Sequence, residues 1–120
     1  MRILIVDDDE MLRTVCSGML SLMQHDPVAV ASGTDAIKRL VTDREPFDLI
    51  LIDEAMPEMN GRETLSRLSA AGVRIPVIVC SGKGTTLEQS SAPPEYLPVA
   101  TLAKPFTMAQ LKSVLKLALT

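Results

Sequence analysis

The chain has 120 residues, of which 47% are hydrophobic and 22% are charged, and its net charge is −3. This length and composition predict one globular domain over residues 1–120, large enough to bury its own core. The negative net charge and an aromatic content of 2% argue against a nucleic-acid surface and against a stacking platform for a base or a flavin.

The two cysteines and the hydropathy pattern indicate the compartment. Cys16 and Cys80 lie in apolar segments without the spacing of a metal site, which is typical of reduced core thiols. No apolar run approaches the roughly 18 residues of a membrane span, and charged residues bracket the short run at the start of the chain. We therefore expect a cytoplasmic protein that contacts neither a membrane nor nucleic acid directly.

The first segment predicts a strand, an acidic loop and a helix. The aliphatic run Arg2–Val6 ends in four consecutive acids at residues 7–10. Residues 11–23 then place most of their apolar side chains at i, i+3, i+4 and i+7, the pattern of an amphipathic helix. Acids in its first turn suit the positive end of the helix dipole, so we expect Asp9 and Glu10 to cap the helix.

The middle of the chain repeats this alternation. A weak strand at 27–31 precedes a helix that begins near Ser32 and carries its apolar face to Val41. Four aliphatic residues, Leu49–Ile52, then end abruptly at Asp53. A strand with apolar side chains in both directions must be covered on both faces, as in the centre of a parallel sheet. The loop that follows contains Pro57 and the turn pair at 60–61.

Two further strands and three helices complete the prediction. A helix over 63–71 is closed by Gly72, and a buried strand over 75–80 ends at Ser81. Residues 85–92 predict a short polar helix that prolines interrupt. A strand over 99–103 leads to Lys104, and the last helix follows with Thr107 as its N-cap and Met108 on its inward face. The alternation predicts an α/β fold, a three-layer αβα sandwich around a five-stranded parallel sheet of order 2-1-3-4-5.

Polar residues follow four of the predicted strands. Three aspartates follow the first strand, Asp53 follows the third, Ser81 the fourth and Lys104 the fifth. In the order 2-1-3-4-5 the first and third strands are neighbours at the switch point, where ligands bind outside the carboxyl ends. We therefore expect these side chains to share one shallow cleft.

This set of groups predicts phosphoryl chemistry. Clustered carboxylates raise one another's pKa unless a cation neutralises them, and oxygen ligands favour Mg²⁺. Mg²⁺ and Lys104 would stabilise the equatorial oxygens of a phosphoryl group, and Ser81 would donate a hydrogen bond to one of them. Asp53 would be the in-line nucleophile, and the product would be an aspartyl phosphate.

The pattern resembles the receiver domain of bacterial two-component response regulators, the CheY-like family, from the acid pair to Lys104-Pro105. The resemblance implies that Asp8 is a direct Mg²⁺ ligand and that Asp7 acts largely through water. It also implies that Asp53 is the phosphorylation site and a metal ligand, with the backbone carbonyl of Ala55 as a third protein ligand. Ser81 matches the switch Thr/Ser and Lys104 the phosphate-binding lysine, and the bond before Pro105 is expected to be cis.

The resemblance also implies partners. A sensor histidine kinase or a phosphotransfer protein would supply the phosphoryl group, and a downstream effector domain or protein would read the change. The chain would act as a signalling switch or phosphorelay element and catalyse only its own phosphorylation and dephosphorylation, without being a turnover enzyme. Two departures, Thr101 near a position that is commonly aromatic and the proline-interrupted helix, predict a different output surface or little output.

Three alternatives share part of the pattern. A haloacid-dehalogenase-type aspartyl-phosphate phosphatase needs Asp-x-Asp, but Ala55 stands where the second acid would be. A flavodoxin needs a phosphate-binding loop after the first strand, where this chain has acids that would repel phosphate. A degenerate receiver used only for protein contacts would lack reactive positions, all of which are filled here.

Overall fold

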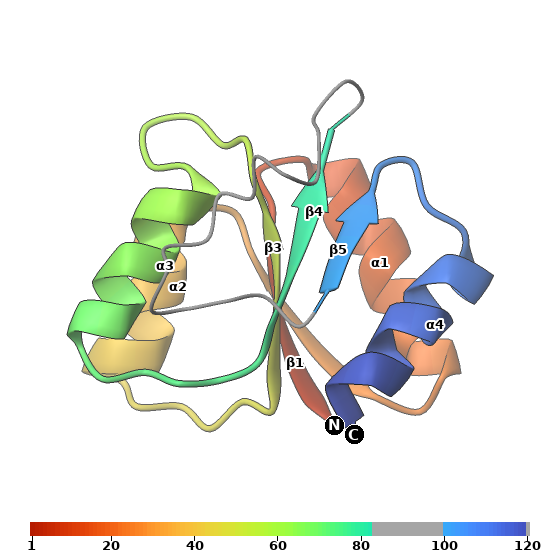
Figure 1. Ribbon diagram of the computed structural model, residues 1–120, viewed down its shortest axis with the longest axis horizontal. Coiled ribbons are helices and arrows are strands. Elements are labelled where there is room, and N and C mark those ends of the chain that lie inside the picture. The colour runs from red at the N-terminus through yellow and green to blue at the C-terminus, as the bar shows by residue number, and fades with distance from the viewer. Residues whose placement is uncertain (83–99, 120) are drawn as a thin grey trace.

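The computed structural model describes residues 1–82 and 100–119, which form a parallel sheet with helices on both faces (Figure 1). The strands are β1 (Arg2–Val6), β2 (Asp26–Val30), β3 (Leu49–Asp53), β4 (Val77–Ser81) and β5 (Ala100–Ala103). The helices are α1 (Glu10–Leu22), α2 (Gly33–Ile37), which continues as a π-helical turn η1 (Lys38–Thr42), α3 (Gly61–Ala70) and α4 (Met108–Leu119).

The sheet has the predicted strand order, β2-β1-β3-β4-β5, and all its pairs are parallel. The central strand β3 is buried along its whole length. This explains its unbroken aliphatic run, because a strand covered on both faces has no solvent side for polar residues.

Two apolar layers fill the spaces above and below the sheet. In Figure 1, α2 and α3 cover one face, and α1 and α4 cover the other. Alternate residues of β3 divide between the layers: Ile50 and Ile52 pack toward α2 and α3, whereas Leu49 and Leu51 pack toward α1 and α4. The period of two in a strand is the reason for this division.

The helix starts follow the capping residues in the sequence. Asp9 accepts hydrogen bonds from the backbone amides of Met11 and Leu12, and Ser32 accepts one from Asp35. Thr107 and Gln110 bond each other's backbone amides reciprocally at the start of α4, which is a capping box. The expected caps at Asp9, Ser32 and Thr107 are therefore confirmed.

Some expectations differ from the structure. Met11 and Leu22, in the predicted apolar stripe of α1, are 75% and 77% exposed, and Met108, expected inward on α4, is 37% exposed. Each helix has only one sheet face to cover, so an apolar stripe wider than that face leaves side chains outside. The helix expected over 85–92 lies outside the described residues.

Candidate functional site

The register of the sheet brings Asp7 and Asp53 together. Val6 of β1 pairs with Ile52 of β3, so the next residue of each strand lies at the same carboxyl edge. Asp7 lies two residues after Ile5, and Asp53 two residues after Leu51; both Ile5 and Leu51 pack on the α1 and α4 side of the sheet. Because alternate residues share a face, both carboxylates lie on the α1 and α4 side of the sheet.

The Lys104 ammonium links the two carboxylates. Its Nζ lies 2.8 Å from Asp7 Oδ2 and 3.0 Å from Asp53 Oδ1. The side chains of Asp7 and Asp53 are 5% and 6% exposed, whereas that of Lys104 is 21% exposed. Two nearly buried carboxylates therefore share one cation that reaches them from the solvent side.

This arrangement shifts the pKa of two of the three groups. Burial raises the pKa of Asp53, and the charge of Asp7 adds to this rise, although Lys104 and the Ala55 amide oppose it. Burial alone would lower the pKa of Lys104, but its hydrogen bonds and charge interactions with Asp7 and Asp53 outweigh burial and raise it. The ammonium is thus held in its charged form beside an acid that ionises less readily than usual.

Asp8 completes a cluster of acids. Each of Asp7, Asp8 and Asp53 offers a carboxylate oxygen, and these oxygens all lie within 4.8 Å of one another. Asp8 is exposed, so its carboxylate can reach an ion from the solvent. An all-oxygen set with net negative charge is the kind of site that Mg²⁺ occupies while it keeps several waters. The donor set therefore fits the metal that the sequence predicted.

The oxygens of Asp53 have different surroundings. Oδ1 accepts from Lys104 at 3.0 Å and from the Ala55 amide at 3.4 Å. Among residues 1–82 and 100–119, no hydrogen bond to Oδ2 is found. Beneath the acids, the free space is only about 10 Å³, so a reactant can approach only from the solvent side.

Ser81 ends β4, one residue after the Cys80 that pairs with Asp53, and takes no part in the ion pairs of Lys104. Its Oγ is buried and has no hydrogen-bond partner among the described residues. The Ser81 backbone carbonyl accepts from the Lys104 amide at 2.8 Å, which ties the ends of β4 and β5 together. A buried hydroxyl without a partner is costly, so an acceptor placed within reach of Ser81 Oγ would gain a hydrogen bond. The peptide bond between Lys104 and Pro105 is cis, as expected.

Two residues near the acids were not identified from the sequence. Arg13 donates from Nη1 to the Asp7 carbonyl oxygen at 2.9 Å, which holds the acidic loop against α1. Gly61 lies so close to β3 that a Cβ there would be 2.7 Å from the Asp53 carbonyl oxygen. The pair at 60–61 was interpreted only as a turn, and nothing in the sequence shows this close approach.

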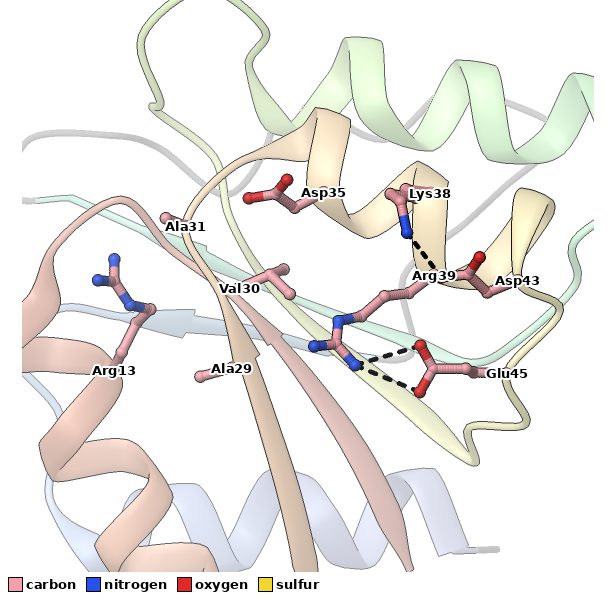
Figure 2. Close-up of a pocket in the computed structure, with 9 residues that line it drawn as sticks. All are labelled: Arg13, Ala29, Val30, Ala31, Asp35, Lys38, Arg39, Asp43 and Glu45. Atoms are coloured by element: carbon pink, nitrogen blue, oxygen red, sulfur yellow. Dashed lines mark hydrogen bonds and ion pairs between the residues drawn. The ribbon is translucent and has the colours of Figure 1, made fainter.

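A larger hollow lies elsewhere, beside β2 and α2 (Figure 2). Its volume is about 520 Å³. Arg39 pairs with Glu45, and Lys38 with Asp43, each at 3.1 Å, so most of its charges satisfy one another. The acid cluster at the carboxyl edge, and not this hollow, is the candidate functional site.

Comparison with known proteins agrees with this geometry. The family model described as "Response regulator receiver domain" matches residues 3–116. The two-component response regulator ORR41 of Oryza sativa subsp. japonica is 33% identical over 69% of this chain and 67% of its own. The DNA-binding transcriptional regulator NtrC of Azospirillum brasilense is 33% identical over 98% of this chain, which spans 24% of the length of that relative.

Solved structures show the same fold. FixJ-N superposes with a TM-score of 0.83 at 26% identity, covering 98% of this chain and 91% of its own. The chemotaxis protein CheY4 of Vibrio cholerae gives 0.82 at 25% identity, covering 96% and 95%. The fold is thus of the CheY-like class, with an acid cluster at its switch point. The chain belongs to the response regulator receiver domain family.

Family membership rules out the dehalogenase-type phosphatase and the flavodoxin, and confirms the predicted family and fold class. The structure brings together Asp7, Asp8, Asp53 and Lys104, whereas Ser81 is linked to Lys104 through a backbone hydrogen bond. No helix in the described part of the chain has the length and apolar character of a membrane span.

Proposed function

We propose that this receiver accepts a phosphoryl group on Asp53 in a Mg²⁺-dependent reaction with a phosphohistidine of a cytoplasmic sensor kinase or phosphotransfer protein. The observation that carries the proposal is the Lys104 ammonium, which lies within 3.0 Å of both buried acids while Asp8 stays exposed beside them. A lysine and three acids at one strand edge form a receptor for an anionic group that arrives with a divalent ion.

The residues divide the chemistry between them. Asp53 Oδ2, which has no hydrogen bond from the described residues, would attack the phosphorus in line with the N–P bond. That bond breaks as the acyl phosphate forms, and its electron pair returns to the histidine ring. Lys104 would move from Asp53 Oδ1 to an oxygen of the attached phosphoryl group, because that oxygen carries more negative charge than Oδ1, which becomes the carbonyl oxygen of the acyl phosphate.

The metal would be held by Asp8, by Asp53 and by the Ala55 carbonyl, with Asp7 acting through water. When bound, Mg²⁺ supplies positive charge to the phosphoryl oxygens. Arg13 and the hydrogen bond from the Asp9 amide to Asp7 Oδ1, 2.9 Å long, would keep the acidic loop in place as charge accumulates.

Ser81 would report the modification. Its buried Oγ lacks a partner among the described residues, so a phosphoryl oxygen within reach would gain its hydrogen bond. That gain favours a state in which the end of β4 lies closer to Asp53, a population shift produced by one local contact. Effector domains or proteins would respond to this shift.

The donor would approach beside the first turns of α1. Met11 is 75% exposed and Val15 is 46% exposed, and both lie in the first two turns of α1, the helix that follows the acidic loop. An exposed apolar surface next to the reactive acid suits a protein donor better than water alone. Met11→Lys should therefore slow transfer from a phosphorylated kinase and leave phosphorylation by acetyl phosphate unchanged.

The decisive experiment is phosphorylation by acetyl phosphate, followed by intact mass. We expect one added phosphoryl mass that requires Mg²⁺ and is absent in Asp53→Asn. A phosphoryl group that persists in Asp53→Asn would contradict the assignment. No addition to the wild type under any Mg²⁺ concentration would favour a degenerate receiver that acts only through protein contacts.

A further inference from the structure

A second feature lies on the α1 and α4 side of the sheet. The C-terminal end of α1, the segment before β2 and one side of α4 enclose a groove of about 380 Å³. Figure 1 shows both helices on this face, with the chain ends at the edge of the sheet away from the acid cluster. The lining residues are Leu22, Met23, His25, Met108, Lys112, Leu115 and Lys116.

The groove has an apolar floor and an apolar rim. Leu115 is 2% exposed and belongs to the core, whereas Leu22 is 77% exposed and Met108 is 37% exposed. The floor is continuous with the core, and the rim consists of large exposed apolar side chains. Covering this surface would remove apolar area from water, which is favourable. Isolated exposed apolar residues are ordinary, but these converge from two helices on one hollow.

The charged side chains that line the groove are both positive. Lys112 and Lys116 line it, both are exposed, and neither has an ion pair in the described part of the chain. No carboxylate is among the lining residues, although the chain as a whole carries −3. Burial, and then the N-terminal amine, lower the pKa of His25, so at neutral pH the two lysines supply the charge.

The spacing on α4 suits a helical ligand. Met108, Lys112, Leu115 and Lys116 stand at i, i+4, i+7 and i+8, which is one side of a helix over about two turns, or roughly 12 Å. Amphipathic helices dock into apolar grooves through anchors at the same intervals. Two unpaired lysines four residues apart complement acids at matching positions on such a ligand.

We propose that this groove binds an acidic amphipathic helix of a partner protein, whose apolar face packs between Leu22, Met108 and Leu115 while its acids pair with Lys112 and Lys116. Lys116 also lies in the last turn of α4, where it stabilises the helix dipole, but Lys112 lies a full turn earlier. A partner seated here leaves the Asp53 face open, so binding and phosphorylation are compatible.

The test uses a synthetic amphipathic helical peptide of about 14 residues with leucines at i, i+3 and i+7 and flanking glutamates, and a matched peptide with lysines in their place. Binding to the full chain is measured by titration, with methyl NMR shifts of Leu22 and Met108 locating the site. We expect the acidic peptide to bind at least about tenfold more tightly than the basic one. Leu22→Ser should weaken it by about tenfold.

Charge reversal gives the stronger control. The double variant Lys112→Glu and Lys116→Glu should invert the preference, so that the basic peptide binds more tightly. Every variant should still take up phosphoryl from acetyl phosphate, which separates this proposal from the function of Asp53. Equal binding of both peptides, or no inversion, would overturn it. So would binding only to anionic phosphatidylglycerol vesicles, or self-association through this face instead of peptide binding.

Discussion

The substitution Lys104→Met should destabilise the metal-free protein more than any other single lysine replacement in the described chain. Methionine keeps most of the side-chain stem but removes the ammonium that lies 2.8 Å from Asp7 and 3.0 Å from Asp53. The two carboxylates, 5% and 6% exposed, then face each other without a cation. Removing one partner of a buried ion pair costs about 3–5 kcal/mol, and the partial exposure of Lys104 places the expected loss at about 3 kcal/mol.

The loss can be measured by thermal denaturation in EDTA. For 120 residues, 1 kcal/mol corresponds to about 4 °C, so the midpoint should fall by about 12 °C. Lys38→Met is the matched control, because Lys38 pairs with Asp43 at 3.1 Å on the surface, with the two side chains 67% and 39% exposed. Its cost should stay below about 1 kcal/mol.

Magnesium should then restore the variant more than it stabilises the wild type. The Lys104 ammonium competes with a metal for the same carboxylates, so its removal should tighten Mg²⁺ binding. Mg²⁺ at about 100 times its dissociation constant would add about 2.7 kcal/mol. A Lys104→Met protein that unfolds at the wild-type temperature in EDTA would refute the reasoning, since the acids would then not depend on the ammonium.

Further predictions concern the same edge of the sheet and the core thiols. Burial raises the pKa of Asp53 above its usual 3.8, so this carboxyl contributes stability that is fully present below pH 3.8 and is lost as the pH rises through the raised pKa. Asp53→Asn in EDTA should therefore melt above the wild type at neutral pH, and the gap should close toward pH 3.8; a gap that widens on acidification would contradict this. Gly61→Ala should destabilise the protein, because its Cβ would lie 2.7 Å from a backbone oxygen. Gly18→Ala, in open space within α1, should instead stabilise the protein by about 0.5–1 kcal/mol, as measured by urea titration. Similar effects of the two substitutions would exclude the proposed clash at Gly61. Burial raises the pKa of Cys16 to about 12 and also raises the pKa of Cys80. The native protein at pH 8 should therefore resist iodoacetamide, whereas both thiols should be labelled in urea. Rapid labelling of the native protein would show that the thiols are accessible.

The elements that depend on local chemistry were predictable. Neighbouring residues are enough to predict the apolar run of β3 and the caps at Asp9, Ser32 and Thr107, because strand burial and helix capping depend on only a few positions. Parallel strands joined by helices admit few topologies, so the strand order and the convergence of Asp7, Asp53 and Lys104 on one edge also followed.

What the sequence by itself determined is therefore the set of strands and helices, the edge at which the acids meet and the family to which the chain belongs. Only the tertiary structure decided that Lys104 binds Oδ1 of Asp53 and that there is no room for a Cβ at Gly61. It also decided that Leu22 and Met108 remain outside the core. Each of these depends on distances between segments far apart in the chain. Periodicity gives the direction of a side chain around its own helix, but only packing shows whether anything covers it.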